Sequence, residues 1–311
     1  MRKMLLVFNP KAGRGEFARK LYNVIDLFSR ANYQIEVYPT NASGSAKTYI
    51  QTYGANFDLI VCSGGDGTMN EVLNAYMKLT NSTSEFTPPG VFTPPQLAYI
   101  PSGTVNDFAS TLKLPRNVMQ SVKSILNGRP RMIDIGLFGN RYFSYVAAFG
   151  FFTDIPYLTD QKAKNVLGRA AYFLESFKHL GNIPAIDCVI KIDGEIIEGQ
   201  FMLGIIANST SIGGFKFNFN KNAAIDDGFF EAIFLQAPKN FIELQDIIKT
   251  LQDIKTNSNF FIKRSAKEIE FSSSQLCDWT IDGEFGGKFY NVNIKNIHNA
   301  INIVVPPISI N

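Results

Sequence analysis

Residues 59–71 read Leu59-Ile60-Val61-Cys62-Ser63-Gly64-Gly65-Asp66-Gly67-Thr68-Met69-Asn70-Glu71. The leading apolar residues predict a buried strand, and the apolar spacing over Met69–Leu79 predicts a helix soon after it. The glycines between them let a ligand approach the backbone closely, and a helix start offers unpaired N–H groups with partial positive charge. Asp66 can hold a magnesium ion on phosphates there or orient a hydroxyl group. The competing interpretation is a glycine turn followed by an Asp or Thr helix cap.

Strands and helices alternate on both sides of this stretch. Strands separated by helices of about 10–15 residues are typical of a parallel sheet that is covered on both faces. Residues 81–95, rich in proline, serine and threonine, predict a long inserted loop. The predicted strands are Lys3–Asn9, Tyr33–Tyr38, Phe57–Cys62 and Leu97–Ile100, and the predicted helices are Glu16–Arg30, Ser45–Tyr53, Met69–Leu79, Thr104–Leu112 and Val118–Asn127.

From about residue 131 the apolar period changes to that of strands. Gly139-Asn140 and Asp193-Gly194 separate alternating segments and predict hairpin turns, so the second domain is predicted to be an antiparallel sandwich or barrel. We predict domains over 1–130 and 131–297, with 298–311 returning to the first. The predicted elements are strands at Met132–Phe138, Tyr142–Ala148, Ile186–Ile192, Ile196–Phe201, Phe229–Leu235, Glu268–Phe271, Cys277–Ile281, Phe289–Ile294 and Ala300–Val305, and a helix at Asn240–Leu251.

Composition removes several classes of protein. The 311 residues are enough for two domains that each bury a core. A formal charge of +3 is too small for a nucleic-acid scaffold but suits an anionic small ligand or an acidic membrane surface. Three separated cysteines argue against a disulfide framework, and two histidines exclude a three-histidine zinc site. The apolar run Met4–Phe8 is shorter than the roughly 7–15 residues of a signal-peptide core, so we expect a cytoplasmic protein.

Two further loops share the layout of the glycine-rich stretch. Phe8–Gly15 follows the first predicted strand and Ile100–Ala109 follows the fourth, and each combines glycine with small polar residues before a helix. In open α/β sheets, ligands bind beyond the carboxyl ends of the strands. The three loops therefore predict a nucleotide cleft at that edge. Helix capping and first-turn charge are expected of Asn106 and Asp107 as well.

The same three loops carry a resemblance to a known family. Asn9-Pro10-Lys11-Ala12-Gly13, Gly64-Gly65-Asp66-Gly67-Thr68-Met69-Asn70-Glu71 and Pro101-Ser102-Gly103-Thr104-Val105-Asn106-Asp107-Phe108-Ala109 resemble the bacterial diacylglycerol kinase catalytic-domain family. These are lipid kinases related to sphingosine kinases and NAD kinases. Ile225–Gly228 and Ile281–Glu284 match its pattern in the second half. The resemblance implies an α/β plus all-β fold, with a three-layer parallel-sheet nucleotide domain, an antiparallel β-sandwich lipid domain and a cleft between them.

The resemblance also implies which residues bind ATP and Mg²⁺. Asp66 would serve both nucleotide binding and catalysis, from a loop position that contributes little to the core. Asp227 would bind a structural magnesium ion together with the carbonyls of Ala224 and Phe229, and the alternative is an Asp-Gly turn without metal. The residues implied to contact ATP are Asn9, Lys11, Gly13, Thr40, Gly64, Gly65, Asp66, Gly67, Thr68, Met69, Asn70 and Thr104.

Asp282 and Glu284 are candidates for the catalytic base. They lie two residues apart at a predicted strand end, so their side chains are expected to share a face. Phosphoryl transfer to an alcohol needs a carboxylate near the attacking hydroxyl. Glu284 is the first choice as base, with Asp282 orienting it, and the choice between them stays open. The alternative is an exposed Asp-Gly-Glu turn, as expected at Asp193–Glu195.

The predicted activity is ATP-dependent phosphorylation of a membrane alcohol, with conversion of diacylglycerol to phosphatidic acid as the first choice. The alternatives are an NAD kinase and a catalytically silent regulator that senses lipid or nucleotide. Basic and apolar side chains over Thr153–Leu180 predict peripheral docking on the anionic inner face of a membrane, with an ordinary amphipathic helix as the alternative. The sequence leaves the oligomeric state open, a homodimer included.

Overall fold

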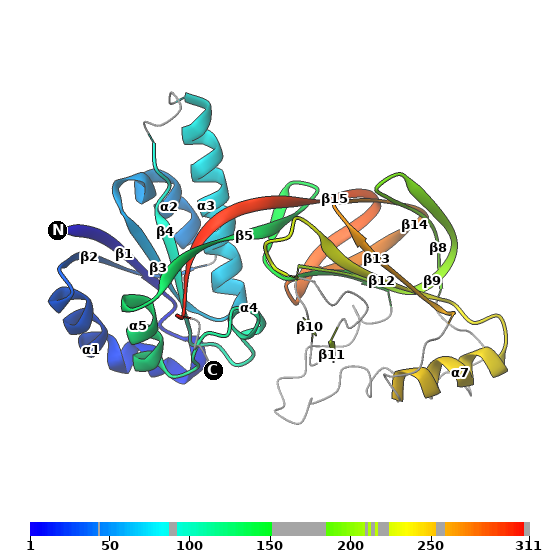
Figure 1. The fold of residues 1–311 in the computed structure, drawn as a ribbon, viewed down its shortest axis with the longest axis horizontal. Coiled ribbons are helices and arrows are strands. Elements are labelled where there is room, and N and C mark those ends of the chain that lie inside the picture. The colour runs from blue at the N-terminus through cyan, green and yellow to red at the C-terminus, as the bar shows by residue number, and fades with distance from the viewer. Residues whose placement is uncertain are drawn as a thin grey trace. The chain divides into compact units, whose positions relative to one another are not determined.

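The computed structural model describes residues 1–42, 44–86, 92–150, 185–208, 211–212, 215–216, 224–252 and 259–307 (Figure 1). The chain divides into two compact units. Unit 1 consists of Met1–Ile135, Arg141–Ser144 and His298–Asn311, and unit 2 consists of Gly136–Asn140 and Tyr145–Ile297. The predicted docking segment, Thr153–Leu180, lies outside the described residues.

Unit 1 contains a sheet of parallel strands. β1 (Arg2–Phe8) pairs in parallel with β2 (Tyr33–Pro39) on one side and with β3 (Leu59–Gly64) on the other. β3 pairs in parallel with β4 (Gln96–Pro101). The C-terminal end of β15 (Glu284–Val305) lies beside β4, also in parallel. The carboxyl ends of β1, β3 and β4 therefore lie next to one another at one edge of the sheet.

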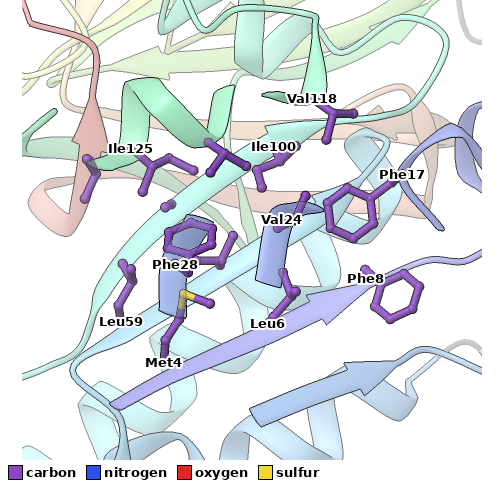
Figure 2. Close-up of a cluster of buried hydrophobic side chains, with 14 residues drawn as sticks. Met4, Leu6, Phe8, Phe17, Val24, Phe28, Leu59, Ile100, Val118 and Ile125 are labelled. Carbon is purple, nitrogen blue, oxygen red and sulfur yellow. The ribbon is translucent and has the colours of Figure 1, made fainter. Parts of the chain in front are cut away.

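Helices pack on this sheet through apolar side chains. Figure 2 shows Phe17, Val24 and Phe28 of α1 together with Val118 and Ile125 of α5 over the side chains of the strands. Burial of apolar area of this kind contributes roughly 25 cal/mol per Å². Around Gly54, Ile60 of β3 meets side chains of α2 and α3 instead. The helices of unit 1 are α1 (Glu16–Arg30), α2 (Ser45–Tyr53), α3 (Asp66–Phe86), α4 (Asp107–Thr111) and α5 (Val118–Leu126), with 3-10 helices at Ala12–Gly15 and Gly54–Asn56.

Unit 2 is built from antiparallel pairs. β9 and β14 are long strands, and each pairs with β8 along one part and with β7 along another, so these pairings close into a circuit. Trp279 of β14 is buried against the rings of Phe138, Phe149 and Phe271. The elements outside β1–β4 are β5 (Arg129–Phe138), β6 (Arg141–Phe143), β7 (Val146–Gly150), β8 (Ile186–Ile192), β9 (Glu195–Ala207), β10 (Ser211–Ile212), β11 (Phe215–Lys216), β12 (Phe230–Gln236), α7 (Phe241–Gln252), β13 (Phe261–Ala266), β14 (Glu268–Ile281) and β15.

Several predicted boundaries are wrong, each for a local reason. The strands predicted at Glu268–Phe271 and Cys277–Ile281 are one strand, β14, which continues through a register shift of polar residues between them. The predicted strand Tyr142–Ala148 is divided into β6 and β7. The predicted loop 81–95 begins too early, because α3 continues to Phe86.

The helix predicted from Thr104 begins only at Asp107, since Asn106 has a positive φ of 57° that a helix cannot contain. Among the residues described above, no helix combines the length and the apolar character needed to span a bilayer.

Candidate functional site

The three glycine-containing loops of unit 1 are held together by backbone hydrogen bonds. Gly64 O, at the end of β3, accepts from Ser102 N at 2.9 Å and from Gly103 N at 3.1 Å in the loop after β4. Asn9 N, at the end of β1, donates to Ser63 O at 2.9 Å. The structure thus brings together the loops that the sequence predicted to meet.

Glycine is required where these loops touch. Gly13 has a positive φ of 54°, and a Cβ atom there would clash with the carbonyl oxygen of Ser102. A Cβ atom on Gly103 would clash with the backbone of Gly65. The third loop therefore contacts the first and the second loop only because glycine has no side chain at these positions.

Asp66 joins the second loop to the third. It is the first residue of α3, and its carboxylate accepts from Asp107 N at 3.2 Å and from Phe108 N at 3.4 Å. These are the first N–H groups of α4, which the helix itself cannot satisfy. Asp66 was expected to contribute little to the core, and the structure adds that its side chain caps a neighbouring helix.

Asn106, the residue before α4, does a different job from the expected capping. Its Oδ1 accepts from Gly103 N at 3.0 Å, and its Nδ2 donates to Gly103 O at 2.7 Å. The hydroxyl of Tyr99 lies 3.2 Å from the same Oδ1 and 3.1 Å from Gly64 O. Burial raises the pKa of Tyr99 well above its usual range, and the nearby Asp66 carboxylate adds to the effect, so the hydroxyl remains a donor.

The other predicted ATP ligands lie on these loops or beside them. Thr40 N donates to Phe8 O at 2.8 Å, which places the end of β2 beside the end of β1. Asn9 donates from Nδ2 to the hydroxyl of Thr68 at 3.4 Å. Lys11 and Thr104 are exposed, whereas the side chain of Met69 is fully buried and leaves only its backbone for a ligand.

The Asp282–Gly283 segment of unit 2 is a two-residue turn. Both residues have positive φ, 48° and 82°, and Ile281 pairs with Glu284 across the turn. Oδ1 of Asp282 accepts from Tyr145 N at 3.0 Å and from Val146 N at 3.2 Å. The predicted placement on one strand end is therefore wrong: Asp282 lies buried in the turn, whereas Glu284 begins β15 and is exposed.

Asp193–Gly194 forms a turn with the same construction. Both residues have positive φ, and the Asp193 carboxylate accepts from Lys267 N and Glu268 N, at 3.0 Å and 2.8 Å for its shortest bonds. Asp193 is exposed, whereas only 3% of the Asp282 surface is exposed. The two Asp-Gly-Glu sequences thus differ in burial and not in local geometry.

Asp227 gathers the residues predicted to bind magnesium. Its carboxylate accepts from Ala224 N and from Phe229 N, both at 3.0 Å. The predicted donor set, one carboxylate and two carbonyls, is of the oxygen type that Mg²⁺ prefers, and each oxygen of this carboxylate already accepts one backbone N–H group. Within the described ranges no group of three or more His, Cys, Asp or Glu side chains could hold a metal ion.

Sequence reasoning missed Tyr99 and Asn74. Tyr99 lies inside a predicted strand, where an aromatic residue signals only burial. Asn74 lies inside a predicted helix, and it binds the backbone of Tyr142 through two hydrogen bonds of 2.9 Å. Neither residue belongs to a glycine-rich motif, so nothing in the local pattern distinguished them.

Comparisons with known proteins agree with this architecture. The profile of the diacylglycerol kinase catalytic domain matches residues 3–138. Diacylglycerol kinases of Staphylococcus aureus strains RF122 and MRSA252 are each 32% identical over 303 residues, which cover 97% of this chain and 91% of theirs. The crystal structure of a diacylglycerol kinase from Bacillus anthracis Sterne, 23% identical, covers 98% of this chain and 97% of its own with a TM-score of 0.72.

A second structure from the same strain is 24% identical and reaches a TM-score of 0.76 over 98% of this chain and 96% of its own. These structures match the mixed α/β fold over nearly its full length, and the 32% identical diacylglycerol kinases together with the catalytic-domain profile place the chain among the lipid kinases. The chain belongs to the diacylglycerol kinase family. The resemblance inferred from its motifs is confirmed.

The contact between Gly13 and Ser102 can be tested with a matched pair of variants. Gly13 and Gly15 both have positive φ, so an alanine at either position costs about 1–2 kcal/mol of backbone strain. Only Gly13→Ala also meets a backbone atom at clashing distance. We expect Gly13→Ala to lower the free energy of unfolding in urea by more than Gly15→Ala does. Equal losses would mean that the loops are not in contact there.

Proposed function

We propose that the protein transfers the γ-phosphoryl group of ATP to the free hydroxyl of diacylglycerol, giving phosphatidic acid and ADP. The observation that carries the proposal is the fastening of three glycine loops to one another at the carboxyl edge of β1, β3 and β4. This edge offers the backbone N–H groups and close approach that phosphates need. Diacylglycerol is chosen as the acceptor because the relatives that are 32% identical over 97% of the chain are diacylglycerol kinases.

ATP is assigned to the loops of unit 1. Asn9, Gly13, Gly64–Asn70 and Thr104 provide backbone and small polar groups, with Thr40 beside them at the end of β2. The exposed side chain of Lys11 is assigned to a phosphate, while the backbone N–H of Lys11 donates to Asn9 Oδ1 at 2.9 Å. Asp66 contributes to catalysis by fixing the loops, and its charge is available to a phosphate-bound cation.

Glu284 is assigned as the base. Oδ1 of Asp282 already accepts two backbone N–H groups, so Asp282 is the residue that holds the turn, and Glu284 presents an exposed carboxylate. Glu284 accepts the proton of the lipid hydroxyl, whose oxygen forms a bond to the γ-phosphorus, and the bond from that phosphorus to the β–γ bridging oxygen breaks to release ADP.

Magnesium is assigned to the Asp227 turn. The carboxylate of Asp227 with the carbonyls of Ala224 and Phe229 would hold the ion, which stabilises the turn before β12 electrostatically. The ion is structural in this assignment, and no proton or phosphoryl step passes through it.

We also propose how each of the two units is built and where in the cell the enzyme works. Unit 1 is a three-layer nucleotide domain, supported by α1 and α5 over one face of the sheet and by the contacts of Ile60 with α2 and α3. Unit 2 is a β-sandwich lipid domain, supported by its closed circuit of antiparallel pairs.

A diacylglycerol leaves a bilayer at a cost of about 0.8 kcal/mol per CH₂, so the enzyme works from the cytoplasm at the anionic inner membrane surface.

Transfer of labelled phosphate from ATP to an extracted lipid mixture tests the activity. Mass identification of the labelled product should give phosphatidic acid, and NAD supplied in parallel should remain unlabelled. Labelling of NAD, or of a lipid other than diacylglycerol, would contradict the assignment.

The base is tested by Glu284→Gln. We expect kcat to fall by roughly 10²-fold, because the hydroxyl loses its proton acceptor. ATP affinity measured by calorimetry should stay at the wild-type value, since Glu284 serves the acceptor. Glu195→Gln is the matched control, because Glu195 is the exposed glutamate of the other Asp-Gly-Glu turn and forms an ion pair with Arg264. A wild-type kcat for Glu284→Gln would remove Glu284 from the reaction.

A further inference from the structure

Residues 141–146 are held at both ends by side chains from distant parts of the chain. The first end belongs to unit 1, where Asn74 of α3 pairs with Tyr142. Oδ1 of Asn74 accepts from Tyr142 N at 2.9 Å, and Nδ2 donates to Tyr142 O at 2.9 Å. One amide side chain therefore satisfies both backbone groups of Tyr142, as a neighbouring strand would.

Asn70 fixes the orientation of this amide. Nδ2 of Asn74 also lies 2.9 Å from Asn70 O and 3.1 Å from Asn70 Oδ1, and Asn70 donates from its own Nδ2 to Tyr142 O at 3.2 Å. The two asparagines are one helical turn apart and therefore share a face of α3. Because α3 starts at Asp66, the helix that begins in the nucleotide loop also holds Tyr142.

The other end of the segment belongs to unit 2 and is held by Asp282. Its carboxylate accepts from the N–H groups of Tyr145 and Val146, and its own N–H donates to Val146 O at 2.8 Å. Only Phe143 and Ser144 lie between the two held ends, and both are buried. The segment is thus short and buried, and it is bonded within unit 1 at its start and within unit 2 at its end.

We propose that Asn74 is a positioning residue for phosphoryl transfer. It fixes the backbone of Tyr142, and through the short segment to Val146 it fixes the Asp282 turn that carries Glu284. The proposal rests on the role assigned to Glu284 in the proposed function. Loss of Asn74 removes the side-chain acceptor of Tyr142 N–H and one of two donors to Tyr142 O, so the start of the segment shifts to find another partner.

Asn74→Ala tests the proposal in the full-length protein. We expect kcat to fall by roughly 10-fold to 10²-fold through misplacement of the base, with a smaller change in the KM for ATP, because Asn74 also bonds to Asn70. Asn81→Ala is the matched control on the same helix, because among the described residues Asn81 donates only to the hydroxyl of Tyr142, at 2.9 Å. Its kcat should equal that of the wild type. A wild-type kcat for Asn74→Ala, or a change confined to the KM for ATP, would overturn the proposal.

A double-mutant cycle separates this link from general damage. If Asn74 and Asp282 act on one segment, Asp282→Asn should lower kcat by a smaller factor in the Asn74→Ala background than in the wild type. In the Asn81→Ala background, Asp282→Asn should have its full effect. Full multiplicative effects in both backgrounds would contradict the link.

Amide hydrogen exchange tests the link without any assay of activity. In Asn74→Ala the amides of Tyr145 and Val146 should exchange faster than in the wild type, while those of Asp107 and Phe108 keep their rates. Unchanged exchange at Tyr145 and Val146 would overturn the proposal even in an active enzyme. Faster exchange in a protein that does not phosphorylate diacylglycerol would support the link and reject only the proposed function.

A milder variant covers the case in which Asn74→Ala fails to fold. Asn74→Asp keeps an acceptor for Tyr142 N–H and loses the donor to Tyr142 O. It should show the same faster exchange at Tyr145 and Val146, and wild-type rates there would overturn the proposal.

Discussion

The carboxylate of Asp66 holds the first N–H groups of α4, and the arrangement of the nucleotide loops depends on this contact. α4 spans only Asp107–Thr111, and a helix of that length is unstable without outside partners. Asp66 is one such partner. The Tyr99 hydroxyl donates to Gly64 O, and the Asn106 side chain accepts from Gly103 N, so these two side chains hold the neighbouring loops. The loops are therefore ordered by the protein itself, which would reduce the loss of conformational entropy when a nucleotide binds there as proposed.

Aspartates in unit 2 serve the same kind of purpose. Asp282 and Asp193 each occupy the first position of a two-residue turn and accept backbone N–H groups from a neighbouring segment. Asp227 does so within its own turn. In all three places the carboxylate organises backbone, and next to Asp282 the exposed side chain of Glu284 is the group to which we assign contact with the lipid hydroxyl.

Much of unit 1 could be predicted from the sequence. The bounds predicted for α1 and α2 are confirmed at both ends, because their apolar spacing and flanking glycines are local signals. The convergence of the three loops followed from parallel strands having their carboxyl ends at one edge. The cap from Asp66 to α4 and the pairing of Asn74 with Tyr142 could not be predicted, since the first joins residues 41 positions apart and the second joins residues 68 positions apart. The sequence did not predict that β14 is one continuous strand, because the period of apolar residues indicates which residues are buried and not which residues pair.

We infer that Asp66 acts by holding the loops together and not solely through a metal ion. The most direct test is calorimetry of ATP binding to wild type and Asp66→Ala with EDTA present, so that no divalent cation contributes. Loss of the cap should weaken ATP binding under these conditions, because the loop after β4 is no longer held. If Asp66→Ala binds ATP as tightly as the wild type, or more tightly because a negative charge is removed, Asp66 does not act by holding the loops together.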